Sequence, residues 1–176
     1  LTVDPTSYAP LLHLIARAES NDNYNAYFGN PDNKSVNFTD MTIDEVLSWQ
    51  ANFVQQGNAS SAVGRYQIID TTLSGLVREL GIDTKQKFDT ATQDKFAVTL
   101  LERRGSEKYV NKKLTREEFA ANLAMEWAAL PKVIGENPTA SYYDGDGLNQ
   151  ARIGIRDVLQ AIDPIRPREH TSPDLI

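Results

Sequence analysis

Residues 16–20 read Ala16-Arg17-Ala18-Glu19-Ser20 and form the predicted last turn of an amphipathic helix. Glu19 follows Tyr8 by eleven positions, which places the two about 20° apart at roughly 100° per residue. Its carboxyl group therefore belongs to the apolar face, where burial favours the neutral form that can donate a proton. The alternative interpretation is a helix-end carboxyl group that reaches water. The apolar face is formed by Leu11, Leu12, Ile15 and Ala16.

A polar stretch follows between Ser20 and Asp40, in which asparagine and aspartate residues are mixed with Tyr24, Tyr27 and Phe28. Such turn chemistry argues against a helix and predicts an irregular lobe with short strands at most. The mixture also suits carbohydrate, since aromatic rings stack on sugars and amides bond their hydroxyl groups. The alternative is that the aromatic side chains only anchor a long loop to the core.

Helix signals recur along the rest of the chain. Capping boxes at Thr42 and Thr115 predict two helix starts, and Thr6 or Ser7 is the expected N-cap of the first helix. Residues 131–147 form a predicted Gly-rich loop, and the proline-containing tail from Asp163 is expected to be extended or disordered and to lie outside the core. The later helices are expected at 42–57, 70–81, 89–105, 115–131 and 148–162.

Composition restricts the classes of function. A chain of 176 residues with 40% hydrophobic content predicts one domain over 1–176, with a core at about 8–162. The net charge of −6 argues against a nucleic-acid partner, and no apolar run approaches the roughly 18 residues of a membrane span. Cysteine is absent, His13 and His170 lie far apart, and residues 144–149 lack the spacing of a calcium loop. We therefore expect neither a metal nor a cofactor.

The order of the motifs resembles the lysozyme superfamily, and most nearly the phage lambda endolysin type of lytic transglycosylase and related phage muramidases. The resemblance covers residues 8–162 and implies an α+β, mainly α fold. In this fold a helical lobe and a small β or irregular lobe flank a cleft. The matching motifs are Glu19-Ser20, Phe38-Thr39-Asp40, Ser61-Ala62-Val63-Gly64-Arg65-Tyr66-Gln67, Gln93-Asp94, Arg104-Gly105, Trp127-Ala128-Ala129-Leu130-Pro131, and a tyrosine at 142 or 143.

The resemblance implies that Glu19 protonates the glycosidic oxygen between N-acetylmuramic acid and N-acetylglucosamine in peptidoglycan. It also implies that Gly64 lets the backbone approach the sugar, and that Tyr66 and Gln67 bond the substrate or hold the acid in place. A plain strand-to-helix turn, with Arg65 as a surface charge, is the alternative for this segment. The other substrate-binding residues that we expect are Ser20, Tyr24, Asp40, Arg65, Trp127, Tyr142 and Tyr143.

The type of reaction depends on a second carboxylate. Hydrolysis by the usual route needs one at about 5–5.5 Å for retention or about 6.5–9.5 Å for inversion, whereas lytic transglycosylases lack it. Asp22, Asp32 and Asp40 could each reach a cleft, which keeps a hydrolytic muramidase as the main alternative. Asp40 matches an aspartate that is not the defining catalytic group of the lambda type, so the transglycosylase is our expectation. A wall-binding or virion structural module without activity is a third hypothesis.

The resemblance places the site of action at the bacterial cell wall, in the periplasm. The pI of about 4.9 favours a virion-bound enzyme, because tethering would supply the local concentration that charge attraction does not. Whether the chain is part of a longer protein stays open.

Overall fold

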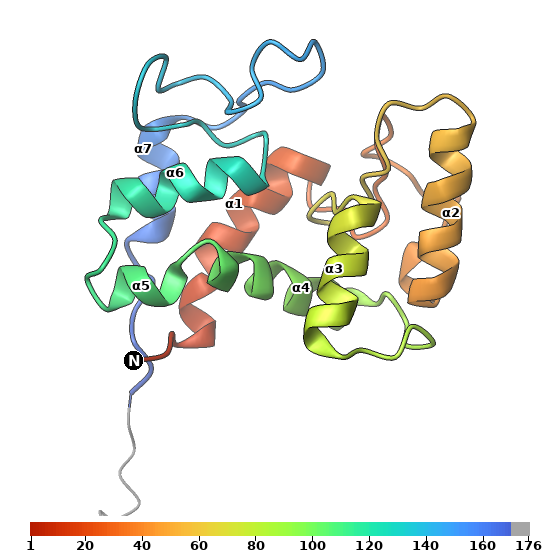
Figure 1. Cartoon of the computed structure of the whole chain (residues 1–176), viewed down its shortest axis with the longest axis horizontal. Coiled ribbons are helices and arrows are strands. Elements are labelled where there is room, and N and C mark those ends of the chain that lie inside the picture. Colours follow the sequence, from red (N-terminus) through yellow and green to blue (C-terminus); the bar gives the residue numbers. More distant parts are fainter. Residues whose placement is uncertain (170–176) are drawn as a thin grey trace, which may run out of the picture. The chain divides into compact units, whose positions relative to one another are not determined.

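The computed structural model describes residues 1–169 (Figure 1). It confirms the mainly helical fold class, because β-pairing within the described residues consists of isolated bridges. The chain divides into two compact units, one formed by residues 16–99 and one by residues 1–15 with the chain from residue 100 onward. The helical elements are the 3₁₀ helices η1 (Pro5–Tyr8) and η2 (Phe38–Asp40) and the α-helices α1 (Ala9–Ser20), α2 (Ile43–Gln55), α3 (Asp70–Leu80), α4 (Thr90–Arg103), α5 (Ser106–Val110), α6 (Arg116–Glu126) and α7 (Ile155–Ile162).

Helices α2 and α3 pack against each other in the unit formed by residues 16–99 (Figure 1). The predicted capping box at the start of α2 is confirmed: the Thr42 hydroxyl accepts the Glu45 amide at 3.2 Å, and the Glu45 carboxylate accepts the Thr42 amide at 3.0 Å. Helix α2 buries Ile43 and Val46 but leaves Val54 43% exposed.

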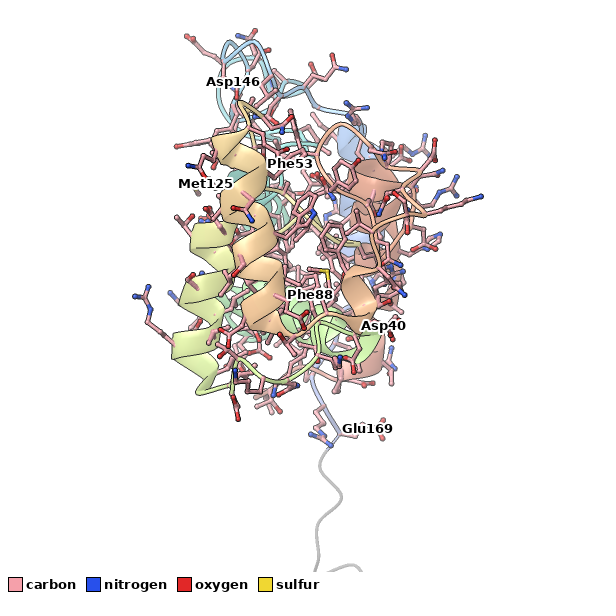
Figure 2. All side chains as sticks on the ribbon, turned by 90° about the vertical axis from the view of Figure 1, so that its right-hand side faces the viewer. Asp40, Phe53, Phe88, Met125, Asp146 and Glu169 are labelled. Carbon is pink, nitrogen blue, oxygen red and sulfur yellow. The ribbon has the colours of Figure 1, made fainter. Side chains whose placement is uncertain are left out.

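An aromatic cluster lies along α2. Trp49 stacks on Phe53 with ring centroids 4.6 Å apart, and Phe38 meets Trp49 edge-on at 4.8 Å. Tyr27 contacts Trp49 at 5.2 Å, and Figure 2 labels Phe53 on this helix. These contacts join the irregular segment after α1 to the helix, so its aromatic residues do anchor a long loop.

The irregular segment contains no α-helix between residues 21 and 41, as predicted. Tyr27 forms a bridge with Val63, which in turn pairs with Ile68. Gln50 on α2 is fully buried and donates its side-chain amide to the carbonyl oxygens of Ser61 (2.9 Å) and Ile68 (3.1 Å). The helix thereby holds the segment from Ser61 to Ile68 in place.

The other unit contains α5, α6 and α7, with α6 in contact with both neighbours (Figure 1). The capping box at Thr115 is confirmed, whereas α5 was not predicted. Helix α6 ends at Glu126, four residues before the expected position near Leu130 and Pro131, because Trp127 takes an extended conformation.

The last helix begins at Ile155, so the expected start near Leu148 is wrong. The Asp146 carboxylate accepts the backbone amides of Leu148 and Asn149, both at 2.8 Å, and the Arg152 amide donates to the Ala129 carbonyl. These bonds replace the helical pattern over residues 148–152, since an aspartate side chain can compete with helix hydrogen bonding.

The N-terminal cap and the tail also differ from expectation. Asp4, rather than Thr6 or Ser7, caps η1. The prediction that the tail lies outside the core is wrong, because Ile165 is only 5% exposed. The Asp4 amide donates to the Arg166 carbonyl at 2.9 Å, and the Arg168 amide donates to the Thr2 carbonyl at 2.8 Å. Residues 170–176 of the tail lie outside the described residues.

No helix in the described part of the chain is long and apolar enough to cross a membrane. Two expectations stay predictions: that residues 1–176 form one domain, and that a cleft lies between two lobes.

Candidate functional site

Glu19 lies in the last turn of α1 and is partly buried, while the adjacent Ser20 is fully buried. The Ser20 hydroxyl donates to the Arg65 carbonyl at 2.6 Å and also lies 3.0 Å from the Ala16 carbonyl. Directly after Ser20 the chain takes two left-handed residues, Asn21 (φ 53°) and Asp22 (φ 67°). The turn of helix that carries Glu19 is thus tied to the backbone of the 64–67 turn.

The 64–67 turn closes the short pairing of Val63 with Ile68. Gly64 has φ 83° and Gln67 has φ 52°, and the Gln67 side-chain amide donates to the Gly64 carbonyl at 2.9 Å. Left-handed conformations at both ends explain why glycine stands at the first of them.

Gln93 of α4 occupies the space beside Gly64. Its side-chain oxygen accepts the Arg65 amide at 2.9 Å, and its amide nitrogen donates to the carbonyls of Tyr24 and Phe88 at 3.2 and 3.1 Å. A Cβ atom on Gly64 would lie 2.5 Å from that same oxygen. We expected the missing side chain to make room for a sugar; in the structure Gln93 and Phe88 fill this space.

Asp94, the next residue of α4, interacts with three other side chains. Its carboxylate accepts the hydroxyl groups of Tyr66 (2.7 Å) and Tyr24 (2.9 Å) and lies 3.3 Å from the Arg65 guanidinium. Arg65 also donates to Asp22 at 2.7 Å, and its guanidinium lies 5.1 Å from the Tyr24 ring centroid and 5.2 Å from that of Tyr66. The charge on Arg65 is therefore shared between two carboxylates and two ring faces.

The environment of this cluster keeps its phenols protonated. Burial and the hydrogen bond to Asp94 raise the pKa of Tyr24 to about 12, and the same two causes raise the pKa of Tyr66 further. Both hydroxyl groups therefore act as donors at neutral pH. Tyr66 is 1% exposed, which leaves almost no surface for direct contact with a sugar, and its role in holding the acid stays a prediction.

The alternative in which Arg65 is a surface charge is wrong, because its side chain is only 15% exposed. Asp40 lies in η2 and is exposed, with its carboxylate accepting the Asn37 amide at 2.6 Å. Its backbone carbonyl accepts the Lys87 ammonium at 2.6 Å. Asp40 therefore lies outside the hydrogen bonds that join Ser20, Tyr24, Arg65 and Tyr66.

Three further predicted residues belong to the other unit. Trp127 is 3% exposed, so almost none of its ring surface reaches solvent, and its expected role in substrate binding stays a prediction. Tyr142 and Tyr143 are 54% and 40% exposed, with ring centroids 5.2 Å apart, and the Tyr143 hydroxyl donates to the Met125 carbonyl. These two tyrosines present ring surface to solvent.

Gln93 and Asp94 belong to the motifs of the resemblance but had no predicted role. The only sign of such a role in the sequence was that these two polar residues are adjacent in a predicted helix. Residues 93 and 94 follow one another on α4, so one side chain reaches Gly64 and the other Tyr66. Within residues 1–169 no group of three or more histidine, aspartate or glutamate side chains is arranged to hold a metal.

A family model described as Endolysin matches residues 9–144, a range that includes Glu19, the 64–67 turn and Tyr143. The chain belongs to the Endolysin family. No curated protein and no solved structure matches it. The endolysin is therefore a phage-encoded protein that degrades peptidoglycan in the bacterial cell wall.

Proposed function

We propose that this endolysin is a lytic transglycosylase that cleaves the β-1,4 bond between N-acetylmuramic acid and N-acetylglucosamine, with Glu19 as the only proton-transfer group. The proposal is supported by two carboxylates that are already bound to other side chains. One is close to Glu19 in sequence, and the other is connected to it through the 64–67 turn. Asp22 is bound to Arg65 at 2.7 Å, and Asp94 accepts two tyrosine hydroxyls. Carboxylates held in this way are poor nucleophiles, because their charge is already neutralised.

The reaction then uses one acid twice. Glu19 donates its proton to the glycosidic oxygen as the bond from C1 of the muramic acid to that oxygen breaks. The 6-hydroxyl of the same sugar forms the new bond to C1 and gives its proton to the Glu19 carboxylate, which restores the acid. The products are a free 4-hydroxyl on N-acetylglucosamine and a 1,6-anhydro-N-acetylmuramic acid end.

Mass spectrometry of digested cell walls tests this proposal. Anhydro ends are lighter by one water, about 18 Da, than hydrolysed ends, because the attacking hydroxyl belongs to the sugar itself. Glu19→Gln should keep the fold and lose lysis, since an amide of the same shape cannot donate the proton. Glu107→Gln, an exposed glutamate on α5, is the matched control and should retain full activity.

Asp22→Asn, Asp32→Asn and Asp40→Asn should each retain substantial activity with anhydro products. Reducing ends, together with complete loss of activity in one of these variants, would instead favour the second function, a hydrolytic muramidase that uses two carboxylates. Near wild-type lysis by Glu19→Gln would remove Glu19 from the mechanism altogether.

The site of action that we propose is the periplasmic face of the wall, reached by a virion-bound or otherwise tethered enzyme. The net charge of −6 supports tethering, because it gives no long-range attraction to anionic wall polymers. A preparation of phage particles that lyses purified walls, and loses this activity with the Glu19→Gln genome, would support the virion-bound form. Particles without the protein would contradict it.

A further inference from the structure

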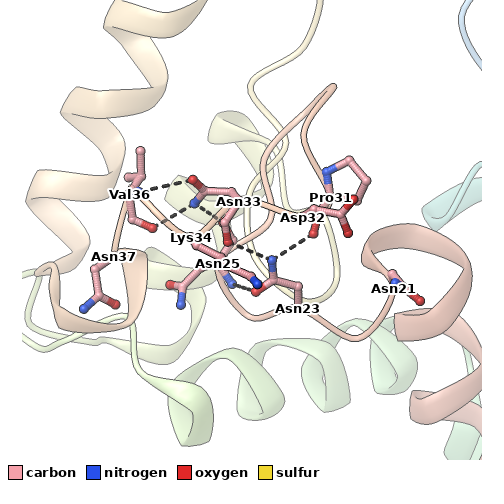
Figure 3. A pocket seen from close by; sticks show the side chains of 9 residues that line it. All are labelled: Asn21, Asn23, Asn25, Pro31, Asp32, Asn33, Lys34, Val36 and Asn37. Atoms are coloured by element: carbon pink, nitrogen blue, oxygen red, sulfur yellow. Dashed lines mark hydrogen bonds between the residues drawn. The ribbon is translucent and has the colours of Figure 1, made fainter.

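A polar pocket of about 570 Å³ is formed by the irregular segment that follows α1 (Figure 3). Its volume lies within the range of small-molecule sites. All nine lining residues belong to one stretch of chain, within residues 21–37, and five of them are asparagines. They are Asn21, Asn23, Asn25, Pro31, Asp32, Asn33, Lys34, Val36 and Asn37.

The wall of the pocket is built before any ligand arrives. Asn33 is 3% exposed, and its amide donates to the carbonyls of Asn25 (2.6 Å) and Val36 (2.8 Å). Asn23 donates to the carbonyls of Pro31 (2.8 Å) and Asn33 (3.1 Å), as the dashed lines in Figure 3 show. Two side-chain amides thus hold this loop together in place of β-sheet hydrogen bonds. The loop therefore loses little conformational entropy when a ligand binds.

The charged groups of the pocket are not used by this framework. Asp32 and Lys34 flank the buried Asn33 and are both exposed. Within residues 1–169 neither side chain has a hydrogen bond or an ion pair with another residue. The pocket therefore offers a fixed lining of amides, one free carboxylate and one free ammonium group.

We propose that this pocket binds the peptide stem of peptidoglycan rather than the glycan strand. Sugar hydroxyl groups can bond to amides and to charged side chains, but they bring no opposite charge for Asp32 or Lys34, whereas a stem peptide carries amides, free carboxylates and, in most stems, an amino group. Lys34 pairs with a stem carboxylate, Asp32 with the amino group, and the asparagines with the peptide amides. The assignment rests on the proposed function for its substrate class, although the binding itself requires no turnover.

The position of the pocket agrees with this ligand. Asn21 is two residues beyond Glu19, so their Cα atoms are at most about 7.6 Å apart. The stem is attached through the lactyl group on C3 of the same muramic acid ring whose C1 takes part in the proposed cleavage. A stem that leaves this ring close to Glu19 therefore starts near the rim of the pocket.

Amide NMR spectra of the full ¹⁵N-labelled chain provide the test, with soluble N-acetylmuramoyl-tetrapeptide as the probe. This probe contains no cleavable glycosidic bond, so binding is measured without catalysis. We expect shift changes in the backbone and side-chain amides of residues 21–37, and none there with peptide-free N-acetylmuramic acid or chitotetraose. Lys34→Gln and Asp32→Asn should each weaken binding at least five-fold, while Lys95→Gln, an exposed lysine on α4, should leave it unchanged.

Three results would overturn the proposal: equal shifts with the peptide-free sugars, shifts confined to other residues, or unchanged affinity in both charge variants. The Glu19→Gln variant should bind the probe as the wild type does. Failure of the transglycosylase proposal would appear as hydrolysed ends in digested walls, with stem binding still measurable. Failure of the stem proposal would appear as lost selectivity in the spectra, with anhydro products still formed.

Discussion

Replacing Gly64 by alanine should destabilise the fold more than its backbone conformation alone requires. A residue other than glycine at φ 83° costs about 1 kcal/mol. The added Cβ would also lie 2.5 Å from the Gln93 side-chain oxygen and 3.2 Å from the Phe88 ring. Gln93 must then move and release the Arg65 amide, a partly buried hydrogen bond whose loss costs about 2 kcal/mol. The expected total is about 3 kcal/mol.

Gly29→Ala is the matched control, because Gly29 has φ 80° but no atom within 4 Å of an added Cβ. Its expected loss is about 1 kcal/mol, from the backbone term alone. Thermal and urea unfolding measure both variants, and 3 kcal/mol corresponds to a fall in Tm of about 6–12 °C for a chain of this size. Equal losses at the two positions would refute the packing argument. A stable Gly64→Ala protein with weak substrate binding would return this glycine to the sugar-contact role.

Two further predictions follow from contacts in the two units. Ending the chain after Ile162 should lower the Tm and the yield of folded protein, because Ile165 is buried; an unchanged melting curve would contradict this. Asp94→Asn should lower the pKa of Tyr24 from about 12, since the carboxylate that disfavours ionisation is gone. Ultraviolet titration measures this shift. The same variant should reduce kcat more than KM, because the Arg65 turn that holds the Glu19 helix loses an anchor; a fall in Tm with unchanged kcat would assign Asp94 a purely structural role.

Local chemistry explains what the sequence could predict. Thr42 and Thr115 each satisfy helix amides through a glutamate three residues later, so their helix starts are encoded within four residues. Gly81, with φ 61°, likewise marks the end of α3. The asparagine-rich composition after Ser20 correctly predicted an irregular segment. The assignment of Glu19 came from the order of motifs, and the family match supports the class of enzyme.

The features that could not be predicted depend on partners distant in sequence. Gln50 is a polar residue of the kind usually found on a helix surface. Its burial is explained only by its hydrogen bonds to the carbonyls of Ser61 and Ile68. Asp94 accepts several hydrogen bonds because the fold brings Tyr24 and Tyr66 to it from other segments. No periodicity or capping rule contains such information, since each of these contacts forms only in the folded chain.

The amide framework of the irregular segment has a consequence for the chemical lifetime of the protein. Asparagine is among the thermolabile residues, and hydrolysis of the Asn33 side chain would leave a carboxylate that can only accept hydrogen bonds. Its oxygens would then face the Asn25 and Val36 carbonyls, which now receive its two donated bonds. One covalent change would thus turn attraction into repulsion in the middle of the segment. Ageing of a stored preparation is for this reason an irreversible process, distinct from the reversible unfolding measured by heat or urea.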